Sequence, residues 1–178
     1  MKISSLQENL KNGLSAVSHI AGKNINLPIL NNVLIEAKDG NIRLITTDLE
    51  IGVIATVRGK IEESGSFTVD AKIISDFISL LQNKKVDINK KDLQLLIRSD
   101  NYKTAVKGQE ADEFPLIPTI DKKNGYAVGA DDLKKALAQI IFAVSTSESR
   151  IELSGVYFSL LKGKLILAAT DSYRLADK

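Results

Sequence analysis

The chain repeats itself after 123 residues, and this internal repeat constrains the fold more than any other feature of the sequence. A slide by that distance places Thr47-Asp48 on Thr170-Asp171 without a gap. Further coincident pairs are Leu10 with Leu133, Leu14 with Leu137, Leu30 with Leu153, Val33 with Val156 and Leu44 with Leu167. A repeat at a fixed period indicates duplication of one supersecondary unit, so the chain is expected to be modular.

Each copy of the unit has the pattern strand, helix, strands, and the copies begin near residues 1, 66 and 126. Apolar residues three or four positions apart predict one helix in each copy. The apolar stripes are Leu6, Leu10, Leu14, Val17 and Ala21, then Ile74, Phe77, Ile78 and Leu81, then Leu133, Leu137, Ile140, Ile141 and Val144. Ser5 and Glu8 have the spacing of a capping box before the first helix, and Asp70 is the expected N-cap of the second.

Runs of β-branched and apolar residues, separated by turn-forming pairs, predict the strands. Their expected ranges are 33–37, 42–46, 50–57, 65–69, 86–89, 93–99, 102–107, 151–160 and 165–170. Asp39-Gly40 is a strong hairpin signal between the first two strands. Glu62-Glu63 is expected to be a solvated turn. Helices combined with antiparallel hairpins predict an α+β fold.

Two of the three prolines, at positions 115 and 118, exclude regular structure there, because proline lacks an N–H donor and fixes φ. Together with the polar run 121–125, this segment is interpreted as an interdomain linker. It divides the chain into one domain at 1–120 and the first half of a second domain at 121–178. Half a domain exposes a sheet edge, so we expect the natural chain to continue beyond Lys178.

Composition excludes several classes of function. The chain has no cysteine and one histidine, His19, which removes thiol nucleophiles and disulfides and disfavours metal and acid–base sites. No apolar run approaches the roughly 20 residues of a membrane span, and the N-terminus lacks the apolar core of a signal peptide. The missing cysteines fit a cytoplasmic location. The net charge of +2 is too balanced to indicate nucleic-acid binding by itself.

Asp48 and Asp171 leave two interpretations open. They could form the paired carboxylates of a small enzyme, or each could bind the backbone of its own strand-end turn. The second is favoured, because acid–base chemistry needs convergent partners and no histidine lies nearby in the sequence. Lysines on the outer faces of equivalent helices suit phosphate contacts without base reading. They are Lys11, Lys72, Lys134 and Lys135.

Five motifs carry a resemblance to a known family. They are Leu27–Leu34 (LPILNNVL), Thr47–Ile51 (TDLEI), Phe114-Pro115, Leu153–Phe158 (LSGVYF) and Ala169–Ala176 (ATDSYRLA). In this order, they resemble the bacterial sliding clamp, the beta subunit of DNA polymerase III, as an N-terminal fragment. The resemblance implies the DNA clamp fold, with two modules per domain, helices on one concave side and antiparallel sheets outside. It also implies a homodimeric ring around double-stranded DNA, without sequence specificity, catalysis, cofactor or metal.

The resemblance assigns DNA contacts to two loops and to the start of one helix. The DNA-binding positions that it implies are Lys23, Asn24, Lys72, Ser147 and Arg150. Asn24 stands where the family has a DNA-contacting arginine, and Lys23 beside it is expected to substitute for that charge. In the loop 147–152, Ile151 and Glu152 stand where the family often has tyrosines.

The resemblance also implies a groove for short peptides from the polymerase catalytic subunit, the clamp loader, and other polymerases and repair proteins. The groove positions are Leu153, Thr170, Ser172, Tyr173, Arg174 and Leu175. The dimer seam would use the helix 72–82 and the strand 102–106. Its implied positions are Ile73, Tyr102, Thr104 and Val106.

The function implied is that of a DNA polymerase processivity factor, a ring that holds DNA by enclosure and tethers the polymerase. A peptide-binding adaptor with clamp-like modules but no ring is the main alternative. The small enzyme that uses Asp48 and Asp171 is the less favoured one. Ring and adaptor differ in whether closed circular DNA retains the protein.

Overall fold

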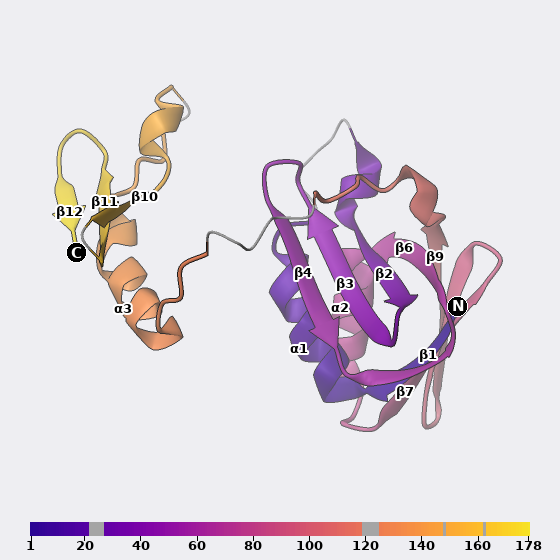
Figure 1. The fold of residues 1–178 in the computed structure, drawn as a ribbon. Helices are drawn as coiled ribbons and strands as arrows, with labels where there is room; N and C mark the ends of the chain where they lie inside the picture. The colour runs from indigo at the N-terminus through magenta and orange to yellow at the C-terminus, as the bar shows by residue number, and fades with distance from the viewer. Residues whose placement is uncertain (22–26, 119–124, 148, 162) are drawn as a thin grey trace. The chain divides into compact units, whose positions relative to one another are not determined.

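The computed structural model describes residues 1–21, 27–118, 125–147, 149–161 and 163–178 (Figure 1). Lys23 and Asn24, two of the sequence-based DNA positions, lie outside these residues. The chain divides into two compact units, which we call unit 1, Met1–Thr119, and unit 2, Ile120–Lys178. No helix of the described residues is long and apolar enough to span a membrane.

The residues of unit 1 that the structure describes form two α-helices and one antiparallel nine-stranded sheet. Its elements in chain order are β1 (Lys2–Leu6), α1 (Gln7–Ser18), η1 (Pro28–Asn31), β2 (Asn32–Lys38), β3 (Asn41–Thr47), β4 (Gly52–Val57), β5 (Gly59–Glu63), β6 (Gly65–Asp70), α2 (Ala71–Leu80), β7 (Lys85–Lys91), β8 (Gln94–Ser99), β9 (Tyr102–Gln109) and η2 (Ala111–Glu113). The order across the sheet is β4-β3-β2-β6-β9-β8-β7-β1-β5. The strands predicted from the sequence are therefore present, and the antiparallel arrangement is confirmed.

The two ends of this sheet are joined by a single residue. β4 ends at Val57 and β5 begins at Gly59, so Arg58 alone connects the two outermost strands. In the middle of the order, β6 and β9 pair only through Thr68 with Gln109 and Val69 with Gly108. The strands consequently form a strongly curved wall, which Figure 1 shows bending from β4 round to β1.

Helices α1 and α2 pack against each other inside this wall and supply much of the core. Leu10, Leu14 and Val17 of α1 are buried, as are Ile74 and Ile78 of α2, in agreement with the predicted stripes. Two polar contacts fix the helices. The Gln7 amide donates to the carbonyl of Ile78 (2.8 Å), and the Thr46 hydroxyl donates to the carbonyl of Val17 at the end of α1 (2.8 Å). Buried polar groups need such partners to offset desolvation.

The capping box predicted at Ser5 is wrong. Ser5 belongs to β1, where it pairs with Gly59 and Val86, and its hydroxyl donates to the carbonyl of Arg58. The N-cap is Leu6, which makes no side-chain cap and is 53% exposed instead of buried. Strand pairing on both sides of β1 outweighs the local capping preference, because it satisfies backbone groups along the whole segment.

The solvated turn predicted at Glu62-Glu63 is also wrong, because both residues belong to β5. Glu62 forms an ion pair with Lys2 of the adjacent β1 (2.7 Å). Strands that carry many charges are typical of sheet edges, where charge discourages pairing with other chains. Two other local predictions, a helix cap and a hairpin turn, are confirmed. The Asp70 carboxylate accepts from the N–H of Ile73 (2.8 Å) as the cap of α2, and Asp39 and Gly40 have positive φ in the β2–β3 hairpin.

The described residues of unit 2 form one α-helix, two 3₁₀ turns and a three-stranded antiparallel sheet. Its elements are α3 (Ala130–Ile140), η4 (Ile141–Ala143), η5 (Ile151–Leu153), β10 (Tyr157–Leu161), β11 (Lys164–Thr170) and β12 (Leu175–Asp177), in the order β10-β11-β12. The strand predicted at 151–160 is wrong at its start, since residues 151–153 form a 3₁₀ turn. Ile141, predicted inside the helix stripe, is 60% exposed, because α3 ends at Ile140 and the tighter turn directs Ala143 inward instead.

Candidate functional site

The repeated Thr-Asp pair forms the same turn in both units. In unit 1, Asp48 Oδ1 accepts from the N–H groups of Glu50 (3.0 Å) and Ile51 (2.7 Å) between β3 and β4. In unit 2, Asp171 Oδ1 accepts from the N–H groups of Tyr173 (3.0 Å) and Arg174 (3.0 Å) between β11 and β12. Both carboxylates therefore bind the backbone of their own turn, as the favoured interpretation predicted.

The threonine before each aspartate completes the turn. The Thr170 hydroxyl donates to the carbonyl of Arg174 (2.7 Å) and accepts from the N–H of Ser172 (3.1 Å). Asp171 Oδ2 accepts from Arg174 Nε (2.9 Å), and the guanidinium of Arg174 lies 5.4 Å from the centre of the Phe142 ring. The hydrogen bonds from Tyr173 and Arg174 lower the pKa of Asp171, because they favour the ionised form.

One residue of the predicted DNA loop reaches this turn. Arg150 Nη1 donates to Ser172 Oγ (2.8 Å), so the loop and the turn are hydrogen-bonded to each other. Ser147 is exposed and its hydroxyl lies 2.7 Å from that of Ser149. Arg150 and Ser172, assigned to different sites from the sequence, are thus brought together.

A pocket of about 450 Å³ opens beside this turn, and we call it the turn pocket. Its lining residues are Glu152, Leu153, Gly155, Val156, Tyr157, Ala168, Ala169, Thr170 and Leu175. Three of the six sequence-based groove positions are in the lining, namely Leu153, Thr170 and Leu175. Ser172, Tyr173 and Arg174 lie in the adjacent turn, where Tyr173 is 97% exposed.

The remaining lining residues were missed by sequence reasoning. Tyr157 and Ala168 are partners in the β10–β11 register, so a hairpin prediction continued to the level of register would have placed them together. Glu152 is the last residue of the predicted DNA loop and carried no pocket signal of its own. Its exposed carboxylate is the only charged group in a lining that is otherwise apolar or neutral, in the part of the chain that the structure describes.

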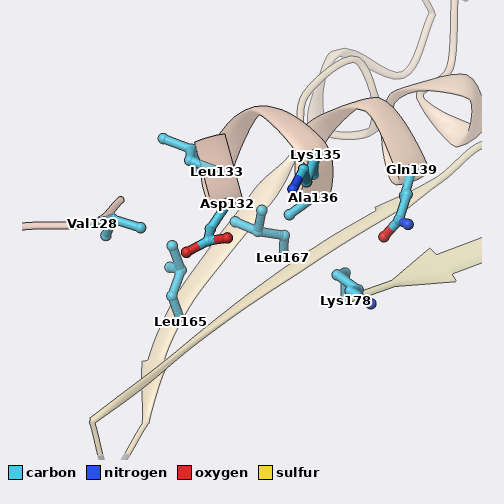
Figure 2. A pocket seen from close by; sticks show the side chains of 9 residues that line it. All are labelled: Val128, Asp132, Leu133, Lys135, Ala136, Gln139, Leu165, Leu167 and Lys178. Carbon is cyan, nitrogen blue, oxygen red and sulfur yellow. The ribbon is translucent and has the colours of Figure 1, made fainter. Parts of the chain in front are cut away.

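A second pocket of about 410 Å³ lies between α3 and β11. Figure 2 shows Leu133 and Ala136 of the helix on one side of it and Leu165 and Leu167 of β11 on the other. None of the sequence-based groove positions lines this pocket, so it is separate from the predicted peptide groove.

Lys72 occupies the second position of α2 and is exposed. It lines a polar hollow of about 400 Å³, together with Ser18 of α1 and Ser75 of α2. Of the other candidate phosphate contacts, Lys11 is exposed on α1, and Lys134 and Lys135 are exposed on α3.

The predicted dimer positions lie on α2 and β9. Ile73 is 55% exposed and Tyr102 is 53% exposed, whereas Val106 is 7% exposed and belongs to the core. The side chain of Val106 is therefore unavailable to a partner. Residues 102–107 pair with β8, and among the described residues no strand pairs with their other edge.

No cluster of three or more His, Asp or Glu side chains that could hold a metal occurs in the described ranges. Asp48 and Asp171 belong to different units, and each carboxylate binds its own turn. The geometry thus offers a pocket for an apolar ligand beside a hydrogen-bonded turn, in a module of helices and antiparallel sheet.

Comparison with known proteins shows to which class of fold this chain belongs. Over 99% of its length, the chain superposes on the DNA polymerase III beta subunit of Thermotoga maritima, with 31% identity and a TM-score of 0.92, covering 48% of that chain. It superposes equally on a Bartonella birtlesii sliding clamp bound to griselimycin, with 29% identity and a TM-score of 0.91, covering 49% of that chain. The fold is therefore that of the DNA clamps.

Matches between the chain and models of protein families identify the particular family. The N-terminal domain of the DNA polymerase III beta subunit matches residues 1–118, and the central domain of that subunit matches residues 127–178. The beta sliding clamp of Synechococcus elongatus is 33% identical over 179 aligned positions, which cover 99% of this chain and 48% of the relative. The chain belongs to the bacterial beta sliding clamp family and spans about half the length of the relatives that it matches.

Proposed function

We propose that this chain acts within a DNA polymerase processivity clamp, a ring that encloses duplex DNA and tethers the replicative polymerase. The observation that carries the proposal is the ordered match of two consecutive clamp domains, at residues 1–118 and 127–178. In this function the protein is not an enzyme and needs no cofactor. Engagement of Asp48 and Asp171 by their own turns supports this over the enzyme alternative.

Contact with DNA is proposed to involve phosphates only. Exposed lysines on the helices, such as Lys11 and Lys72, suit this role, because weak backbone contacts leave a ring free to slide. Lys23 and Asn24, which lie between α1 and η1 in the sequence, are proposed to contact DNA. Ser147 and Arg150 are proposed to do so from unit 2.

The turn pocket is proposed to bind short peptides from the polymerase catalytic subunit, the clamp loader, and other polymerases and repair proteins. Leu153, Val156 and Leu175 provide apolar surface for a leucine or phenylalanine side chain. The pocket lies beside a turn that hydrogen bonds of Asp171 and Thr170 hold in place. Preorganisation of this kind lowers the entropic cost of binding.

A homodimeric ring is proposed to close through α2 and β9, with Ile73, Tyr102 and Thr104 supplying side chains. The edge of β9 at residues 102–107, with which no described strand pairs on the side away from β8, suits strand addition from a second copy. The cytoplasm, where replication proteins work, is the proposed location. A non-ring adaptor would have the pocket but not this dimer seam. Whether a closed ring forms therefore distinguishes the clamp from the adaptor.

A peptide titration tests the docking part of the proposal. We expect a labelled peptide with a Leu-Phe anchor to bind the 178-residue chain, and Leu175→Asp to weaken that binding about tenfold or more, because a carboxylate is then placed in the apolar lining. Tyr173→Asp should also weaken it, by less, since Tyr173 lies outside the lining. Leu80→Asp is the matched control, being 84% exposed in unit 1. Equal affinity of Leu175→Asp and Leu80→Asp would refute the assignment.

A further inference from the structure

Glu152 places an exposed carboxylate in the lining of the turn pocket. Within the described residues, no hydrogen bond or ion pair engages this side chain, which is exposed to solvent. The nearby cationic groups are held elsewhere. Arg174 is bound to Asp171 (2.9 Å), and Arg150 donates to Ser172 (2.8 Å). The negative charge of the pocket is therefore available to a ligand.

We infer that Glu152 is a specificity-determining residue of the turn pocket, which selects peptides that carry lysine or arginine next to their apolar anchor. The inference rests on the proposed docking function and names the chemistry of the partner. Leu153, Val156 and Leu175 accept the anchor, and the carboxylate attracts a cation placed beside it. A neighbouring aspartate or glutamate in the peptide is rejected by the same charge, and repulsion of this kind contributes to specificity.

The two arginines do not reverse this preference. Asp171 compensates the charge of Arg174, whose guanidinium also packs over the Phe142 ring at 5.4 Å. Arg150 donates to the turn, and neither arginine is among the residues that line the pocket. Among the described residues, Glu152 is therefore the one charged residue in the lining of the pocket.

Three matched peptides test the inference. Fluorescein-labelled Gly-Ser-Xaa-Leu-Phe-Ser-Gly, with Xaa as lysine, glutamine or glutamate, is titrated against the 178-residue chain by fluorescence polarisation. We expect affinity to fall from lysine to glutamine to glutamate by about two- to fivefold per step, the range of an exposed ion pair. The differences should shrink in 1 M salt, because the Debye length is then only about 3 Å.

Variants assign the effect to Glu152. The preference for lysine should disappear in Glu152→Gln and reverse in Glu152→Lys. It should persist in Glu50→Gln, which makes the same charge change at an exposed position of unit 1. Binding of the glutamine peptide with no preference for lysine, or a preference that survives in Glu152→Gln, overturns the inference and leaves docking intact. Failure of all three peptides to bind refutes the docking function and the inference with it.

Discussion

Leu49 and Ser172 stand 123 residues apart and share one unusual backbone conformation, with φ of +79° and +78°. Each follows the aspartate of a Thr-Asp pair and donates its N–H to the threonine hydroxyl, at 3.0 Å in unit 1 and 3.1 Å in unit 2. Neither is glycine, the residue that adopts positive φ most easily. The Thr-Asp pair, not the residue that follows it, therefore fixes this turn.

Strain at Leu49 gives the first prediction. A left-handed backbone costs other residues about 1–2 kcal/mol more than glycine. The conformational entropy that glycine loses on folding offsets about 0.5–1 kcal/mol of this, so Leu49→Gly should stabilise unit 1 by about 0.5–1 kcal/mol. Leu49 is 56% exposed, so little packing is lost. Leu49→Ala removes the same side chain but keeps the strain, and should give no gain. Urea denaturation of the three proteins measures the difference, and a less stable glycine variant would contradict this explanation.

The pKa of Asp171 gives a prediction about acid. Hydrogen bonds from the N–H groups of Tyr173 and Arg174 lower this pKa in the folded chain. The ionised carboxylate therefore stabilises the turn at pH values above the unfolded pKa, about 3.9, and this contribution is lost as the pH falls through the lowered folded value. The amide NMR shifts of residues 173 and 174 should titrate with a midpoint below 3.9. They should not titrate in Asp171→Asn, and a midpoint above 3.9 would refute the assignment.

Gly108 gives a prediction about the junction of β6 and β9. A Cβ atom at this position would collide with the carbonyl oxygen of Thr68 and lie 2.5 Å from Phe67 Cε1. Gly108→Ala should therefore destabilise unit 1 by about 3 kcal/mol, the upper end of the range for overpacking. Gly155→Ala is the control, since a Cβ there meets nothing within 4 Å. A similar urea midpoint for Gly108→Ala and the unaltered chain would show that the junction can move apart.

Local sequence signals were sufficient to predict most of the fold. The spacing of Leu10, Leu14 and Val17 predicted α1 and its buried face, and Asp39-Gly40 predicted the first hairpin, because these patterns involve neighbours in the sequence. The failures involve distant partners. Ser5 was assigned to a helix cap because nothing local indicates that β5 and β7 pair on both sides of β1. The edge strand β5 was missed because its charges resemble those of a loop.

In the candidate site, too, the sequence did not reveal the features that depend on residues distant in the chain. The resemblance identified Leu153, Thr170 and Leu175, and these three residues line one pocket. Ala168 lines that pocket because the β10–β11 register places it opposite Tyr157. Glu152 lines it because it belongs to the turn η5, which was predicted as a strand. The contact between Arg150 and Ser172 joins two segments that the sequence separates by 22 positions. Such relations depend on tertiary packing and have no local signature.

Retention on circular DNA is the most direct test of the proposed clamp. A chimera would join this chain to the second half of a crystallised relative and be loaded onto a nicked plasmid by that relative's clamp loader. If the chain forms part of a closed ring, the chimera should co-elute with the circular plasmid in gel filtration and be lost when a restriction enzyme linearises the DNA. Equal retention on the circular and the linear plasmid would contradict enclosure.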